Sequence, residues 1–181
     1  MQQVFSNFVL IGMPGAGKST AGVILAKRAS LGFVDTDVLI QTSQGQTLQE
    51  VVDTKGHEAL RRIEEEVILA LSVRHHVIAT GGSAVYSSRA MSHLRSDGLI
   101  IYLEVDLPAL KRRVPDYSRR GIAKRPDQSF SDLFAERTAL YEKYADLTVP
   151  CAGLSQEAVC DKILEAAEGR TGFSFPRPDS G

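Results

Sequence analysis

The chain has 181 residues, of which 43% are hydrophobic, and its formal net charge is −1. This length suits a single domain of ordinary size, 1–181, with a normal hydrophobic core. The balanced charge argues against nucleic acid or an anionic membrane surface as the main partner. No apolar run approaches the roughly 20 residues of a membrane span, and the first residues lack a basic region and a cleavage site. We therefore expect a cytoplasmic protein.

Short apolar runs alternate with longer segments of helical periodicity along the whole chain. The predicted strands are 7–11, 33–35, 76–79, 99–103 and 147–149. The predicted helices are 18–29, 47–55, 57–73, 87–95, 107–114, 130–144 and 155–167. Alternation without clear hairpin signals predicts an α/β fold, with three α/β/α layers around a five-stranded parallel sheet.

Two segments differ in composition from the rest. Residues 114–128 are polar, rich in arginine and lysine, and carry prolines and a glycine, which indicates a mobile lid. Residues 169–181 are rich in glycine, serine and proline, and we expect this tail to be frayed.

The strongest motif follows the first strand and fits the phosphate-loop pattern G-x-x-x-x-G-K-[ST]. Its glycines let backbone amides turn toward phosphate oxygens, and the following helix adds the positive end of its dipole. Lys18 supplies charge for the β- and γ-phosphates, the Ser19 hydroxyl can ligate Mg²⁺, and Thr20 can contact the α-phosphate. The predicted ATP-binding residues are Gly12, Gly15, Ala16, Gly17, Lys18, Ser19 and Thr20, with Mg²⁺ as cofactor.

The sequence favours a small kinase over other classes that use this loop. An N-K-x-D pattern, which would specify guanine, occurs nowhere in the sequence. The strand at 76–79 is followed by Thr80, Gly81 and Gly82 rather than by the carboxylate usual in motor-type ATPases.

An acidic pair, Asp35 and Asp37, follows the second predicted strand. Carboxyl ends of parallel strands face the ligand crevice, and spacing of two residues can direct both carboxylates into it while the strand is still extended. One carboxylate can hold Mg²⁺ and the other can orient a hydroxyl or accept its proton. The alternative is that the pair only caps a helix.

The chain resembles the shikimate kinase family over roughly residues 5–165. The resemblance rests on the phosphate loop and on four further motifs in order: F-V-D-T-D at 33–37, G-H-E-A-L-R-R-I-E at 56–64, T-G-G-S at 80–83 and E-R-T-A-L-Y at 136–141. It implies transfer of the γ-phosphoryl group of ATP to the 3-hydroxyl of shikimate, a step of aromatic amino acid biosynthesis. We also expect a monomer that binds neither nucleic acid nor membrane.

On the nucleotide side, the resemblance implies that Lys18 is the phosphate-loop lysine and Ser19 the metal ligand. Asp35 is similar to the family's residue near Mg²⁺. Arg120 resembles the lid arginine that closes over ATP and acts in catalysis, with Arg119 as a competitor for this role.

On the substrate side, the resemblance makes Asp37 the residue that grips and activates the hydroxyl. Arg61 and Arg137 resemble the arginines that bind the substrate carboxylate, and a planar guanidinium suits two carboxylate oxygens. Gly81 and Gly82 are similar to the glycines that let substrate approach the backbone. The alternative for each arginine is a surface ion pair with a neighbouring glutamate.

The sequence departs from the family pattern around the substrate. Ser83 stands where the family has a third glycine, Leu60 replaces a phenylalanine, and the lid reads Arg120-Gly121-Ile122-Ala123 where arginine, proline and two leucines are usual. A related kinase for another small hydroxy or amino acid, such as homoserine, is therefore an alternative. A nucleotide-binding regulatory protein without turnover is an alternative of another class.

Overall fold

A computed structural model describes residues 5–117, 120–168 and 170 of the chain. Arg119 and, apart from residue 170, the expected frayed tail lie outside the described residues. Among the helices of the described ranges, none combines the length and the hydropathy that crossing a membrane requires.

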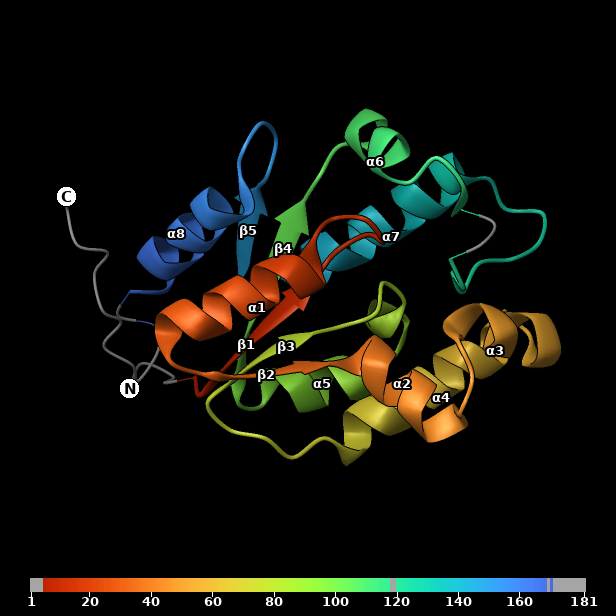
Figure 1. Ribbon diagram of the computed structural model, residues 1–181, viewed down its shortest axis with the longest axis horizontal. Helices are drawn as coiled ribbons and strands as arrows, with labels where there is room; N and C mark the ends of the chain where they lie inside the picture. The colour runs from red at the N-terminus through yellow and green to blue at the C-terminus, as the bar shows by residue number, and fades with distance from the viewer. Residues whose placement is uncertain (1–4, 118–119, 169, 171–181) are drawn as a thin grey trace.

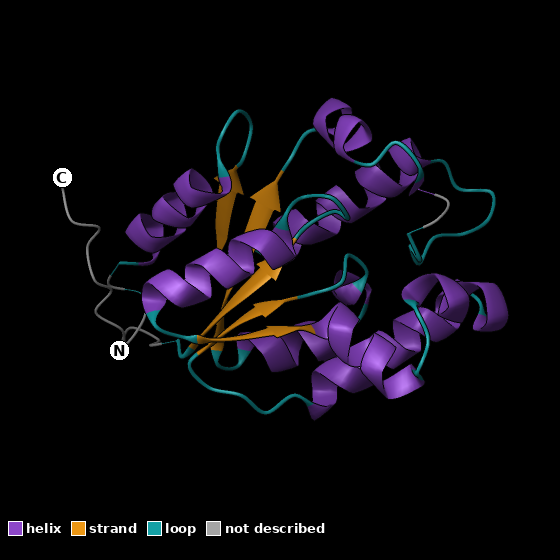
Figure 2. Cartoon of the chain, viewed as in Figure 1, coloured by secondary structure: helices purple, strands orange, loops and turns teal. Residues whose placement is uncertain are grey.

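Five parallel strands form one sheet in the order β2-β3-β1-β4-β5. Their bounds are β1 Asn7–Ile11, β2 Gly32–Asp35, β3 His76–Ala79, β4 Gly98–Glu104 and β5 Leu147–Pro150. Every residue of the central strand β1 is buried, as expected for a parallel strand covered on both faces. Because all strands run the same way, the loops after them leave one edge of the sheet (Figure 2).

Helices cover both faces of the sheet and confirm the three-layer expectation. In Figure 1, α1 and α8 lie together on one side of the sheet, and α5 and α7 lie behind it. The helices are α1 Lys18–Ala29, α2 Thr36–Gln44, α3 Leu48–Lys55, α4 His57–Ala70, the 3-10 turn η1 Ala84–Tyr86, α5 Ser88–Arg95, α6 Leu107–Arg113, α7 Phe130–Tyr144 and α8 Gln156–Ala167.

Most predicted boundaries lie within one residue of the observed ones, and two larger differences are a helix that was not predicted and the end of another helix. The helix α2 was not predicted, because its segment TDVLIQTSQ is short and buries only Thr36 and Ile40, which leaves little apolar periodicity. The helix α4 ends at Ala70 rather than at 73, because Leu71 already has extended backbone angles, φ −74° and ψ 121°.

The hydrophobic core has two parts. The larger one fills the space between the sheet and its helices. The smaller one joins Ile40, Val51 and Leu60, from α2, α3 and α4, to Ala123 of the 114–128 segment. This second cluster therefore packs the predicted lid against the helices beyond β2.

Candidate active site

A cleft of ≈ 430 Å³ opens at the edge of the sheet where the strands end. The phosphate loop forms one wall of it, and the lid residues Arg120–Ala123 form another. Asp37, Gly81, Gly82 and Arg137 line the space between these walls, so the structure brings distant parts of the predicted site together.

The phosphate loop joins β1 to α1 and depends on glycine where its backbone turns. Gly15 and Gly17 have φ angles of 86° and 93°, a region that residues with a Cβ atom rarely adopt. Gly15, Gly17, Ser19 and Thr20 line the cleft. Ala16 is buried behind it and Gly12 lies against the backbone of β4, so these two shape the loop from behind.

Lys18 is buried at the start of α1. Its ammonium group donates hydrogen bonds to the carbonyl oxygens of Gly12 at 2.7 Å and Met13 at 2.9 Å. Burial lowers the pKa of Lys18 to about 8, against the opposing effect of the Asp37 carboxylate. The Lys18 ammonium group therefore lies beside the phosphate loop, where it could bind phosphate oxygens of a nucleotide.

Ser19, which lines the cleft, lies in contact with Asp35 at the end of β2. The Ser19 hydroxyl donates to one carboxylate oxygen of Asp35, and the other oxygen accepts the backbone N–H of Asp37 at 2.9 Å. Asp35 therefore caps α2, as the alternative interpretation expected, and its second carboxylate oxygen faces Ser19, the predicted metal ligand. A role of Asp35 near Mg²⁺ stays a prediction.

These oxygens fit Mg²⁺ in chemical type, because hydroxyl and carboxylate oxygens are ligands that this ion accepts. Within the described ranges, no group of three or more His, Cys, Asp or Glu side chains could hold a metal ion on its own. A magnesium ion at Ser19 and Asp35 would take its remaining ligands from water and nucleotide phosphates, as is usual for this ion.

Asp37 lies in the first turn of α2, so the expectation that the strand is still extended at this residue was wrong. The chain turns into the helix at Thr36, because Asp35 supplies the cap. The Asp37 carboxylate nevertheless lines the cleft. Burial raises the pKa of Asp37, Lys18 and Arg137 oppose the rise, and Asp35 adds to it.

Gly81 and Gly82 lie where side chains crowd the backbone after β3. A Cβ atom on Gly81 would lie 2.6 Å from Asp37 Oδ1 and would also overlap the Glu64 carboxylate. A Cβ atom on Gly82 would lie 2.7 Å from Arg137 Nη1. The close approach of these side chains to the backbone therefore favours glycine at both positions. The role of the two glycines in substrate approach stays a prediction.

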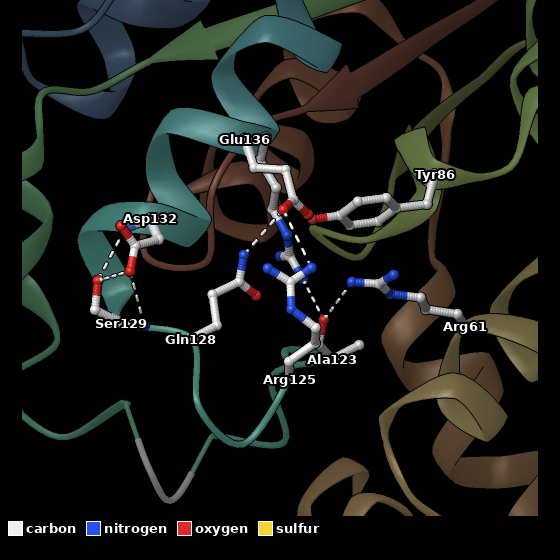
Figure 3. Close-up of polar contacts among 9 residues, drawn as sticks. Arg61, Tyr86, Ala123, Arg125, Gln128, Ser129, Asp132 and Glu136 are labelled. Atoms are coloured by element: carbon white, nitrogen blue, oxygen red, sulfur yellow. Dashed lines mark hydrogen bonds and ion pairs between the residues drawn. The ribbon is translucent and has the colours of Figure 1, made fainter.

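The two predicted arginines converge on one backbone oxygen. Arg137 Nη2 and Arg61 Nη2 donate to the carbonyl of Ala123 at 2.9 Å and 3.2 Å, and Figure 3 shows the dashed contacts meeting there. Arg137, 1% exposed, lines the cleft, whereas Arg61 lines a smaller adjoining cavity. Their Nε atoms are buried without a hydrogen-bond partner.

The alternative of surface ion pairs is not supported for these arginines. Within the described part of the chain, neither forms an ion pair with a glutamate. Two guanidinium groups that share one neutral oxygen form an electropositive pocket with spare donors. Such a pocket suits a carboxylate.

Glu64 is a site residue that sequence reasoning missed. It is 2% exposed, lines the cleft, and accepts a hydrogen bond from the Ser83 hydroxyl. Burial and the neighbouring Asp37 carboxylate raise its pKa to about 7. The signal was available, because Glu64 is four residues from both Leu60 and Ile68 and so shares their buried face of α4.

Tyr86 is a second residue without a sequence prediction. It ends η1, directly after the loop that carries Gly81 and Gly82, and its ring lies against Arg61. No pattern in the sequence predicts a role for Tyr86, because its contact with Arg61 forms only when the loop after β3 packs against α4.

The lid arginine remains a choice between two residues. Arg120 is exposed and lines the cleft. Arg119 lies outside the described residues, so the assignment of this role to Arg120 stays a prediction.

The family model and the similar proteins of known identity all point to the same family. The family model described as shikimate kinase matches residues 14–168. The shikimate kinase of Colwellia psychrerythraea is 37% identical over 88% of this chain and 95% of its own length, and that of Thermodesulfovibrio yellowstonii is 34% identical over 90% and 95%.

Solved structures give the same result. Shikimate kinase from Acinetobacter baumannii in complex with shikimate superposes with a TM-score of 0.84 at 27% identity, over 92% of this chain and 95% of the other. Shikimate kinase from Aquifex aeolicus superposes with a TM-score of 0.77 at 31% identity, over 90% and 96%. The phosphate loop, the acidic pair and the paired arginines thus lie in a matching fold, and this chain belongs to the shikimate kinase family.

Proposed function

We propose that this protein phosphorylates the 3-hydroxyl of shikimate with ATP, and that the residues gathered at the cleft have the roles predicted from the sequence. The observation that carries the proposal is the convergence of Arg61 and Arg137 on the Ala123 carbonyl, with Arg137 lining the same cleft as Asp37 and the phosphate loop. A carboxylate held by the arginines would present a ring hydroxyl toward Asp37, between the two ends of the cleft.

The proposed mechanism is an in-line displacement. The shikimate hydroxyl oxygen attacks the γ-phosphorus, the bond to the β,γ-bridging oxygen breaks, ADP leaves, and the hydroxyl proton passes to Asp37. Lys18 and Arg120 offset the charge that develops on the transferred group. Bound Mg²⁺ would neutralise phosphate charge from its place beside Ser19 and Asp35.

The lid contributes by excluding water. Ile122 and Ala123 of the lid are buried, and Arg120 lines the cleft. A closed lid limits transfer of the phosphoryl group to water, which would waste ATP. We further propose that the protein acts as a monomer in the cytoplasm.

The test is a coupled assay of ADP release with ATP, Mg²⁺ and a panel of acceptors that includes shikimate and homoserine. We expect shikimate to give the highest kcat/KM by a wide margin. The Asp37→Asn variant should bind ATP normally while its kcat falls by about 100-fold or more, because the base is lost. Preference for homoserine, or ATP binding with no acceptor-stimulated ADP release, would contradict the proposal.

A further inference from the structure

Tyr86 links the two arginines of the proposed carboxylate pocket. Arg61 Cζ lies 3.6 Å from the centroid of the Tyr86 ring, and Arg137 Cζ lies 5.5 Å from it. Both distances are within the range of cation–π attraction. Figure 3 shows Arg61 and Tyr86 reaching from one side of the site toward Ala123 and Glu136.

The Tyr86 ring is a contact that orients the Arg61 guanidinium. Its hydrogen bond to Ala123, at 3.2 Å, fixes one nitrogen only, and its Nε atom has no partner. Two guanidinium groups that share a carbonyl also repel each other. The negative face of an aromatic ring near both lowers this repulsion without competing for the N–H donors of Arg61.

The ring itself is fixed from its far end. The Tyr86 hydroxyl donates to the carboxylate of Glu136, which also accepts from Gln128 Nε2 at 3.0 Å. Glu136 precedes Arg137 on α7. The tyrosine therefore connects the arginine on α4 to the helix that carries the second arginine.

We propose that Tyr86 is a positioning residue for substrate recognition, whose ring face holds the Arg61 guanidinium in the orientation that receives the substrate carboxylate. This inference rests on the proposed function, because it takes shikimate as the carboxylate ligand. Tyr86 acts through Arg61 and does not touch the reacting atoms.

The test compares two substitutions that separate the ring from its hydroxyl. Tyr86→Leu removes the ring face, and we expect the KM for shikimate to rise about 5- to 30-fold, the range that a partly buried cation–π contact supports. Tyr86→Phe keeps the ring face, and its KM should stay within about threefold of the wild-type value. The KM for ATP should not change in either variant.

Controls separate positioning from general damage. Tyr144→Leu makes the same change at the last residue of α7, where the ring lies 5.2 Å from Lys143 Nζ, and it should leave the KM for shikimate unchanged. In the Arg61→Ala background, Tyr86→Leu should add nothing, because its effect passes through Arg61. If the leucine variant does not fold, Tyr86→Met carries the same expectations.

Three results would overturn the inference: an unchanged KM in Tyr86→Leu, equal impairment in Tyr86→Phe, or a full effect in the Arg61→Ala background. Each presupposes a wild-type protein that phosphorylates shikimate. A wild type that lacks this activity would instead refute the proposed function, so the two failures are distinct.

Discussion

Lys18 combines a buried position with a charge that the reaction needs. In the free protein its ammonium group donates to carbonyl oxygens of its own loop, and burial lowers its pKa to about 8. A bound triphosphate favours the charged form of a lysine and so raises this pKa again. Nucleotide binding is therefore linked to protonation of Lys18 in the mildly alkaline range.

We predict that ATP binds about tenfold more weakly at pH 9 than at pH 7, because the free protein loses the Lys18 proton as the pH rises through about 8. Titration calorimetry with Mg²⁺ in buffers of different ionisation heats should show proton uptake near pH 8. Lys18→Met should bind ATP weakly at both pH values and lose the dependence. Equal wild-type affinity at pH 7 and pH 9 would contradict this linkage.

At the scale of elements, the lid is held against α3 by a contact that only glycine permits. Gly121 has a φ angle of 57°, and its N–H donates to Gln49 Oε1 at 2.7 Å. A Cβ atom at this position would overlap the backbone of Leu48 and Gln49. The proline that the family usually has at this position has no N–H and could not donate this hydrogen bond. The contact between Gly121 and Gln49 therefore depends on the glycine of this chain.

We predict that Gly121→Ala loosens the lid. Trypsin should cleave the 114–128 segment about tenfold faster than in the wild type, because the docked conformation no longer fits, and kcat for shikimate should fall. Mass spectrometry of the early fragments locates the cleavage.

The matched control is Gly45→Ala. Gly45 has a similar φ angle of 62°, but open space surrounds the position of its missing Cβ atom. This variant should lose about 1 kcal/mol of stability from backbone strain while lid cleavage stays at the wild-type rate. Equal cleavage in the two glycine variants would show that the lid is not docked through Gly121.

The elements also show what local sequence can and cannot predict. The phosphate loop was predicted residue by residue, because its chemistry lies in one contiguous motif between a buried strand and a helix. The helix α2 entered only as the alternative in which the acidic pair caps a helix, because its apolar periodicity is weak. The strand order β2-β3-β1-β4-β5 depends on which edges pair after collapse, and alternation of strands and helices does not encode it.

At the scale of the whole molecule, the site joins segments that only the fold brings together. Ser83, in place of a third glycine, adds a hydrogen bond to Glu64 from a different element. The sequence showed that position 83 was unusual but not which side chain would meet it. The same holds for Tyr86 and Arg61, whose contact requires α4 and η1 to pack side by side.

The buried carboxylate of Glu64 links the stability of the whole protein to pH. Its pKa is about 7 in the folded protein, against an ordinary value of 4.5, mainly because of burial. The folded state therefore keeps a proton that the unfolded chain releases. Raising the pH from 4.5 toward 7 makes this group progressively less favourable to folding, and the full penalty applies above pH 7.

We predict that Glu64→Gln is more stable than the wild type at pH 8, by on the order of 1 to 3 kcal/mol, and that the difference shrinks toward pH 5. Glutamine keeps an acceptor for Ser83 and removes the charge. Urea unfolding at pH 5, 6, 7 and 8 measures the effect. Glu66→Gln, at an exposed position of the same helix, should change stability little across this range. A Glu64→Gln variant that gains most at pH 5 would reverse the sign of the linkage and show that the carboxylate is stabilised, rather than penalised, by its place between Asp37 and Arg137.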